Sequence, residues 1–331
     1  MEIIEIDGES LNLDILKKIV YENRKLKISE DSIEKMKNSR QVVEKALNDD
    51  VMIYGINTGF GRLSNVKIDR DKVKLLQRNL VRSHAGGVGK NLSNDIVRAV
   101  MAIKINALAK GYSGCRPQLA SLMVEMLNRE IYPLIPEKGS VGASGDLAPL
   151  AHLALVLIGE GEVYLEGEIL PGFYALKKVG LNPLTLEAKE GLSILNGTQV
   201  MTAIAALALL KLKNIAKAAD IIAAMTAEAV LATDAAFDQK IHSLRGLECQ
   251  KRVAENLRKL LHQSEIIESH KKCERVQDPY SIRCIPQVHG ASREVFQWSV
   301  ELVEKEMNAA SDNPLVFADK ANIISGGNFH G

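Results

Sequence analysis

The sequence has few aromatic residues: six Phe, seven Tyr and one Trp among 331 residues. A hydrophobic core with so few rings must be built from Leu, Ile, Val, Ala and Met, which favours packed helices over a β-sandwich. Hydrophobic residues nevertheless make up 46% of the chain and charged residues 25%, as in ordinary soluble globular proteins. The composition therefore predicts a mainly α-helical protein and excludes a disordered or collagen-like one.

An excess of charge of either sign is also missing. The 42 basic and 41 acidic residues leave a net charge of +1, so no overall field favours nucleic acid or an anionic membrane as a partner. The first residues, Met1 to Glu5, lack the apolar stretch of a signal peptide. We therefore expect a cytoplasmic protein with reduced thiols that binds neither nucleic acid nor a membrane.

The patterns that usually mark metal and nucleotide sites are absent from the sequence as well. The four cysteines form no C-x-x-C pair, and the seven histidines form no H-x-x-x-H pair. The glycine-rich stretch from Gly55 to Gly61 lacks the G-K-[ST] ending of a phosphate-binding loop, and Gly86 to Lys90 lacks its spacing. The sequence thus predicts neither a metal nor a nucleotide as cofactor.

Glycine and proline are both missing from Thr198 to Arg245, a stretch of 48 residues that is rich in Ala. This predicts one very long helix or two helices with a tight break, and helices of that length usually lie in bundles. Residues 191–210 carry no charge over the length of a bilayer span. Because the polar residues from Asn196 to Gln199 interrupt them, we reject a transmembrane helix.

Apolar residues at helical spacing predict further helices, and Ser29 is expected to cap the N-terminus of the helix that follows it. A loosely alternating stretch at 162–170, with a turn at Gly167, predicts a small β-hairpin. The further helices are expected within residues 1–50, 71–83, 92–110, 115–130, 147–158, 247–268 and 292–310.

Glycines and polar residues gather in the loops between these helices, where binding residues concentrate. The sharpest signal is the tripeptide Ala143-Ser144-Gly145. Attack of the Gly145 nitrogen on the Ala143 carbonyl carbon, with loss of water, would close a five-membered ring. Loss of a second water from the Ser144 side chain would leave an exocyclic methylidene. The backbone must bend sharply for this, which glycine permits; on its own, the tripeptide would be read as a turn.

The run from Gly139 to His152, which contains this tripeptide, resembles the signature of the aromatic amino acid ammonia-lyases. That family includes histidine, phenylalanine and tyrosine ammonia-lyases and related aminomutases. The resemblance spans the whole chain and implies the family's long-helix bundle with glycine-rich active-site loops. The other segments that resemble the family follow in order: Tyr54 to Gly61, Leu195 to Gln199, Gln277 to Arg283, Ser311 to Leu315 and Gly326 to His330.

The resemblance implies that Ala143, Ser144 and Gly145 form the family's electrophile, 4-methylideneimidazole-5-one (MIO), without a metal or nucleotide. It also implies that Tyr54 removes the β-proton of the substrate, which requires a site that favours the phenolate because the ordinary pKa of tyrosine is about 10. Taken alone, Tyr54 is equally well read as a strand-end tyrosine packed on the core. Asp146 is implied to assist ring formation, and it is also a candidate N-cap of the helix 147–158.

The resemblance further implies a set of residues that bind an amino acid substrate. Arg283 would hold the carboxylate, because a guanidinium binds a carboxylate through two parallel hydrogen bonds. Tyr280 precedes it by three residues, so one helical turn would bring both to the site. The remaining implied residues are the polar Asn196, Gln277 and Asn328, together with Phe329, which would pack on the substrate ring or the MIO.

His84 bears on the substrate, because an imidazole can donate to or accept from a polar ring. The pair Ser83-His84 is similar to that of histidine ammonia-lyases. This implies elimination of ammonia from L-histidine to give trans-urocanate. Tyrosine ammonia-lyases and tyrosine aminomutases also place a histidine here, so tyrosine remains an open alternative.

Members of this family continue beyond the motif at which the present sequence ends, with further helices and, in histidine ammonia-lyases, an active-site glutamate. We therefore expect a C-terminally truncated lyase fold, with an MIO-bearing region at 1–190 and a long-helix region at 191–331. Family enzymes are tetramers with shared sites, which implies a homo-oligomer. The alternative to an active enzyme is a protein of another functional class, namely an inactive truncated scaffold or a partner subunit.

Overall fold

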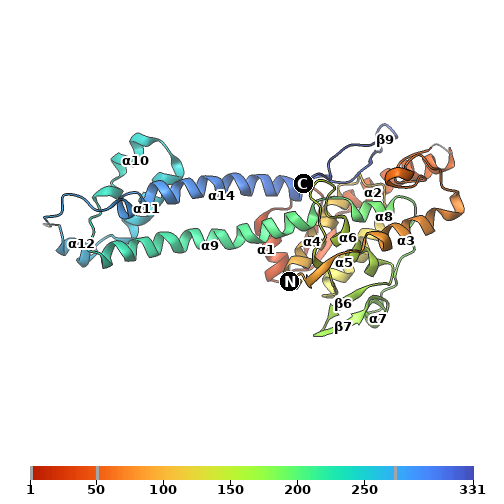
Figure 1. Ribbon diagram of the computed structural model, residues 1–331, viewed down its shortest axis with the longest axis horizontal. Coiled ribbons are helices and arrows are strands. Elements are labelled where there is room, and N and C mark those ends of the chain that lie inside the picture. The colour runs from red at the N-terminus through yellow and green to blue at the C-terminus, as the bar shows by residue number, and fades with distance from the viewer. Residues whose placement is uncertain (1–2, 50–51, 272–273) are drawn as a thin grey trace. The chain divides into compact units, whose positions relative to one another are not determined.

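The computed structural model describes residues 3–49, 52–271 and 274–331, and most of them lie in helices (Figure 1). This confirms the mainly α-helical fold. The chain forms two compact units, one made of Met1–Leu207 with Val303–Gly331 and the other of Ala208–Leu302. Each unit is described below by itself. The predicted division into an MIO-bearing region at 1–190 and a long-helix region at 191–331 stays a prediction. It concerns function, whereas the two units are defined by packing alone.

The core of the first unit is α4 (Asn94–Ala109), in which every residue from Val97 to Ala109 is buried. A helix buried on all sides is expected to be apolar all round, so its buried polar residues Arg98, Lys104 and Asn106 are exceptions that have to be explained. Ser29 caps α2 by accepting a hydrogen bond from the Ser32 N–H, as predicted. The other helices of this unit are α1 (Leu13–Tyr21), α2 (Glu30–Asn48), α3 (Val73–His84), α5 (Pro117–Asn128), α6 (Leu147–Leu157), α7 (Gly172–Lys178) and α8 (Glu190–Leu195).

The strands of the first unit are short and stand in small sheets. The predicted hairpin is confirmed: β6 (Glu162–Leu165) pairs with β7 (Glu168–Pro171). The parallel pair β1 (Ile4–Ile6) and β2 (Leu26–Ile28) was not predicted, because three residues are too few to show an alternating pattern. The remaining pairs are β3 (Val88–Asn91) with β5 (Pro136–Lys138), β4 (Tyr132–Pro133) with β6, and β8 (Leu315–Phe317) with β9 (Asn322–Ile324).

The stretch from Thr198 to Arg245 is not one helix. α9 runs from Gln199 to Ala229, and α10 (Gln239–Arg245) follows after an irregular segment. Tertiary contacts explain the break without glycine or proline: Asp278 accepts hydrogen bonds from the backbone N–H and the hydroxyl of Thr233, and Phe237 is fully buried. The prediction of two helices is therefore correct, although the break is wider than the tight one expected.

The second unit packs the C-terminal part of α9 against α14 (Ile285–Met307), where Arg293 donates to the Ala216 carbonyl oxygen at 2.7 Å. The helix predicted at 247–268 is divided into α11 (Glu248–Leu260) and α12 (Glu265–Ser269), because Gln263 between them has a positive φ of 59°. The helix predicted from residue 292 begins earlier, at Ile285. α13 (Tyr280–Arg283) precedes it.

One helical run of the described residues, Glu190–Ala229, is long and apolar enough to cross a membrane by composition and length. The part of this run that is most apolar is 78% buried inside the protein. Burial of that extent is typical of a core helix, in agreement with the rejection of a transmembrane segment at residues 191–210.

Candidate active site

The tripeptide Ala143-Ser144-Gly145 forms a tight turn in front of α6. The Ser144 N–H donates to the Val141 carbonyl oxygen at 2.8 Å, and Gly145 has a φ of 84°, in the left-handed region that favours glycine. A Cβ on Gly145 would lie 2.7 Å from the Gly197 carbonyl oxygen and 3.0 Å from that of Phe329. The sharp bend expected at the tripeptide is present, and no residue with a Cβ fits its last position.

Asp146 ties this turn to the start of α9. Its Oδ2 accepts from the backbone N–H groups of Val200 (2.7 Å) and Met201 (3.0 Å), and its Oδ1 accepts from the Ser140 hydroxyl at 2.5 Å. Asp146 does occupy the N-cap position of the following helix α6, as the sequence suggested, but its side chain makes no capping hydrogen bond there. Burial raises the pKa of Asp146, while its hydrogen bonds act in the opposite direction.

Asn196 lies beside the turn, in the extended residues between α8 and α9. The next carbonyl oxygen, that of Gly197, accepts from the Asp146 N–H at 2.8 Å. The main chain of Asn196 is bound to α4, because Lys104 Nζ donates to the Asn196 carbonyl oxygen at 2.6 Å. Burial lowers the pKa of Lys104 to about 8.

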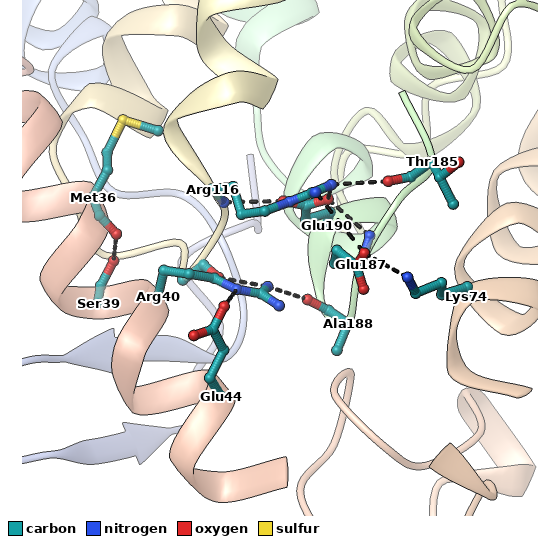
Figure 2. Close-up of polar contacts among 11 residues, drawn as sticks. Met36, Ser39, Arg40, Glu44, Lys74, Arg116, Thr185, Glu187, Ala188 and Glu190 are labelled. Carbon is teal, nitrogen blue, oxygen red and sulfur yellow. Dashed lines mark hydrogen bonds and ion pairs between the residues drawn. The ribbon is translucent and has the colours of Figure 1, made fainter. Parts of the chain in front are cut away.

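The helix that leads to Asn196 is anchored at its beginning by ion pairs and hydrogen bonds (Figure 2). The Glu190 carboxylate is fully buried, and Arg116 donates to it from Nε at 2.8 Å and from Nη2 at 2.7 Å. Two residues earlier, the Ala188 carbonyl oxygen accepts from Arg40 at 2.8 Å. The start of α8 is therefore fixed to two other parts of the first unit.

The loop that carries Tyr54 sits on α8. A Cβ on Gly55 would collide with Leu192 of α8 and approach Pro314 to 3.4 Å, and Gly55 has a φ of 77°. Residues 52–54 form no strand, so the strand-end interpretation of Tyr54 is wrong, while Val51 lies outside the described residues.

The Tyr54 ring is half-buried and meets the Phe60 ring edge-on at 5.9 Å. Burial raises the pKa of Tyr54. Its immediate surroundings thus disfavour the phenolate that a catalytic base would need.

His84 is the last residue of α3 and is partly exposed. Its Nδ1 lies 2.9 Å from the Leu80 carbonyl oxygen. Because a carbonyl oxygen only accepts, Nδ1 is the donor in this contact, and in the neutral imidazole Nε2 is then an acceptor. The loop that follows is attached to α6, since the Gly87 N–H donates to His152 Nε2 at 3.2 Å.

The last segment of the chain passes over the turn. The Gly331 N–H donates to the Gly142 carbonyl oxygen at 2.8 Å, and Phe329 is partly buried with its carbonyl oxygen towards Gly145. Asn328 is exposed, and its Nδ2 donates to the Ala310 carbonyl oxygen at 3.1 Å. Of these predicted residues, Phe329 is the one whose backbone contacts the tripeptide.

Gln277, Tyr280 and Arg283 belong to the second unit, where they line one cavity of about 370 Å³. The Arg283 guanidinium stacks over the Tyr280 ring at 4.7 Å, so one helical turn does bring these two side chains together. Arg283 Nε donates to the Asp278 carbonyl oxygen at 2.7 Å. The two Nη groups then remain as a pair of donors that fits a carboxylate.

Three charged residues that hold Asn196 directly or through one another were not predicted from the sequence: Lys104, Lys189 and Asp312. For Lys104 the available signal was charge in an apolar context, since it stands between the apolar residues 99–103 and Ile105. Within the described part of the chain, no group of three or more His, Cys, Asp or Glu side chains could hold a metal ion.

Comparison with known proteins gives a consistent result. The chain matches the family model for aromatic amino acid lyases over residues 11–331. It is 49% identical over 328 residues to a histidine ammonia-lyase of Myxococcus xanthus, a match that covers 99% of this chain and 65% of that relative. The chain thus spans somewhat less than two thirds of the length of such curated relatives.

Two solved structures are similar over the whole of this chain. Histidine ammonia-lyase from Trypanosoma cruzi has a TM-score of 0.90 and 40% identity, and 61% of its chain is covered. Tyrosine aminomutase from Streptomyces globisporus has a TM-score of 0.92 and 36% identity, and 66% of its chain is covered. The expected lyase-type helical fold is confirmed by both.

Proposed function

Because the chain belongs to the aromatic amino acid lyase family, we propose that it acts as a histidine ammonia-lyase, which eliminates ammonia from L-histidine to give trans-urocanate. The observation that carries the proposal is the turn at Ala143-Ser144-Gly145, which Asp146 ties to the start of α9. Histidine as substrate is supported by the 49% identity to a protein named histidine ammonia-lyase.

The residues present fit MIO as the prosthetic group. Gly145 already has the left-handed conformation of a sharp bend, and a Cβ on Gly142 would meet nothing within 4 Å, so the turn has room to rearrange. The Ser144 hydroxyl, which would leave as water, donates to the Val141 carbonyl oxygen at 3.1 Å. When formed from Ala143, Ser144 and Gly145, MIO supplies an electrophile that turns the substrate amine into a better leaving group.

We assign removal of the β-proton to Tyr54, whose loop rests against Leu192 of α8. A general base must be deprotonated to act. Since burial raises the pKa of Tyr54, only a small fraction is phenolate near neutral pH unless a further positive group approaches it. The rate is therefore expected to rise with pH.

Each of the two units, taken by itself, contains residues that we assign to binding of an amino acid head. The Arg283 Nη groups would bind the carboxylate, with the Tyr280 ring holding the guanidinium in place and Gln277 in the same cavity. Asn196 offers a polar group beside the tripeptide. Phe329 and Asn328 complete the assigned set.

Tyrosine is a second candidate substrate, because the orientation of His84 suits any substrate whose ring carries a hydrogen-bond donor. The free Nε2 accepts a hydrogen bond, which suits a phenol O–H as well as an imidazole N–H. A substrate without a polar ring would leave this acceptor unpaired. The similarity to a tyrosine aminomutase at 36% identity points in the same direction.

We also propose a cytoplasmic homo-oligomer, tetrameric as in the family the sequence resembles. Support comes from apolar side chains exposed along α9 and α14 of the second unit. Ile215 is 60% exposed, Ile222 60% and Val295 63%. Exposed apolar surface of this extent is typical of contact surfaces between protein chains.

Mass spectrometry combined with product analysis tests the proposal. The purified protein is expected to be two water masses lighter than its encoded sequence and to release ammonia and urocanate from histidine. Ser144→Ala is expected to lose the dehydration and nearly all turnover. Ser269→Ala is the matched control, because its hydroxyl also donates to the carbonyl oxygen three residues earlier but lies in the second unit. An unmodified mass with full turnover would contradict the MIO assignment, and product from tyrosine alone would favour the second candidate.

A further inference from the structure

The side-chain amide of Asn196 is held in one orientation. Nδ2 donates to Asp312 Oδ1 at 3.1 Å and to the Asn313 carbonyl oxygen at 2.7 Å. An ionised carboxylate and a carbonyl oxygen only accept, so the amide nitrogen has to face both. Within the described part of the chain, nothing donates to Asn196 Oδ1. The side chain therefore has an acceptor to offer and no donor.

Asp312 is itself fixed by a buried ion pair. Its Oδ2 accepts from Lys189 Nζ at 2.7 Å, and its Oδ1 also accepts from the Asn313 N–H at 2.6 Å. The side chains of Lys189 and Asp312 are 0% and 6% exposed. Because either group alone would be an uncompensated buried charge, the carboxylate cannot turn away from the lysine without a large cost.

Lys189 is fixed on both sides along the chain. Arg40 binds the carbonyl oxygen of Ala188, and Arg116 binds the carboxylate of Glu190 (Figure 2). Lys189 has a φ of 72°, and its Nζ also donates to Ser193 Oγ at 3.2 Å. Its ammonium group is thus held by its backbone as well as by its ion pair.

The same asparagine is held through its main chain by Lys104, which is 1% exposed and donates to the Asn196 carbonyl oxygen. The following residue, Gly197, touches Gly145 and Asp146. Asn196 is therefore held through both its side chain and its main chain, one residue before the glycine that binds the Asp146 N–H. The head of an amino acid has one strong donor, its α-ammonium group, whereas its carboxylate only accepts.

We propose that Asp312 is a positioning residue which, together with Lys189, orients the Asn196 amide so that Oδ1 accepts a hydrogen bond from the α-ammonium group of the bound amino acid. This inference rests on the function proposed above. The substrate carboxylate is an acceptor like Oδ1 and therefore cannot take this place. The ammonium is the group that leaves in the proposed reaction. In this proposal, Lys189, Asp312 and Asn196 together set where it lies relative to Ser144.

Two ligands, each with one of the two charged groups of the amino acid head, test this assignment. Histamine has the ammonium group without the carboxylate, and 3-(imidazol-4-yl)propionate has the carboxylate without the ammonium. Dissociation constants of both are measured by calorimetry for the wild type and for Asp312→Asn. Because Lys189 still needs an acceptor, the new amide turns its oxygen towards Lys189 and its donor towards residue 196. Only the Asn313 carbonyl oxygen then favours the present orientation of the Asn196 amide, so that Oδ1 is no longer held in one place. Loss of a hydrogen bond to a charged group predicts a Kd for histamine that is weaker by about tenfold or more.

The Kd of the propionate is expected to stay the same or to improve, because a donor then faces its carboxylate. Asp220→Asn is the matched control: Asp220 is 2% exposed and accepts from His289, Arg293 and Asn256 in the second unit. It is expected to leave the ratio of the two Kd values unchanged. Equal weakening of both ligands by Asp312→Asn, or weakening of the propionate alone, overturns the proposal.

Asn196→Ala provides a second test if Asp312→Asn does not fold. It should weaken histamine and spare the propionate, and the reverse result contradicts the inference. If the wild type binds neither imidazole ligand, tyramine and 3-(4-hydroxyphenyl)propionate replace them. Binding of that pair alone contradicts histidine as substrate but still tests the role of Asp312, whereas binding of none of the four contradicts both proposals.

Discussion

The Asp146 carboxylate accepts a hydrogen bond from the backbone N–H of Val200 at 2.7 Å, across 54 positions of the chain. This contact joins the turn that carries Ser144 to the first turn of α9. The carboxylate lies at the N-terminal end of α9, where N–H groups without helical partners create a partial positive charge. It therefore both accepts hydrogen bonds from these groups and is stabilised by the helix dipole. The conformation of the tripeptide therefore depends on α9 and not only on the helix that follows it directly.

Asp146→Ala is expected to lower the free energy of unfolding by about 1–3 kcal/mol, because it leaves buried N–H groups of Val200 and Met201 without an acceptor. Dehydration of the tripeptide should slow in the same variant. Chemical denaturation and intact mass measure the two effects. Asp238→Ala removes an exposed cap of α10 and serves as the control, with a smaller loss of stability and no change in mass. An equal effect of both variants would contradict the role given to Asp146.

Gly145→Ala is expected to prevent the turn, because the new Cβ would lie 2.7 Å from the Gly197 carbonyl oxygen at a φ of 84°. A left-handed conformation alone costs an L-residue about 1–2 kcal/mol, and the collision adds to this. Gly142→Ala, three residues before Gly145, meets nothing within 4 Å and should change the unfolding free energy little. Thermal melts of both variants check this, and equal melting temperatures would show that the turn is not constrained.

Tyr54→Phe is expected to keep the fold and substrate binding and to lower the turnover rate by about 10²–10⁴-fold, as for loss of a general base. Tyr174→Phe is the control, since Tyr174 also meets a phenylalanine ring edge-on at 5.9 Å but is 68% exposed. Steady-state kinetics and substrate affinity separate rate from binding. A loss of tenfold or less would assign the base to another group.

The pH dependence of the Tyr54 step follows from the direction of its pKa. Burial raises the pKa, so the active phenolate becomes more abundant as pH increases through the alkaline range. The turnover rate of the wild type should therefore keep rising above neutral pH until the protein unfolds. A rate that is flat between neutral and alkaline pH would mean that a positive group absent from the immediate surroundings of Tyr54 lowers its pKa.

Lys104 predicts a distinct pH dependence of stability. Its pKa is lowered from 10.5 to about 8 by burial, so between these values the unfolded chain binds more protons than the folded one. The unfolding free energy should thus increase with pH across this window, by about 3 kcal/mol in total. Lys104→Met lacks this dependence. Denaturation at several pH values should give a difference between wild type and variant that grows from pH 8 upwards, and parallel curves would contradict the burial of a charged lysine.

Much of the candidate site is visible in local sequence. Glycine is required at position 145 because only that residue tolerates the bend, and the tripeptide chemistry needs just the three residue types in order. Ser29 and the hairpin at 162–170 follow local rules of capping and turns, and both are found as predicted. These features depend on neighbours a few residues away, which a single sequence contains.

Other features were decided by contacts between distant residues. The break after Ala229 follows from Asp278 and Phe237, and no glycine or proline marks it. The partner of Asp146 is α9 rather than α6, because burial brings a second helix terminus with unpaired N–H groups to the same carboxylate. The orientation of Asn196 depends on Asp312, 116 positions later. The sequence by itself determined which chemical groups are available and where the chain bends, while the tertiary structure decided which buried donor meets which acceptor, since polar groups removed from water must be paired wherever the fold places them.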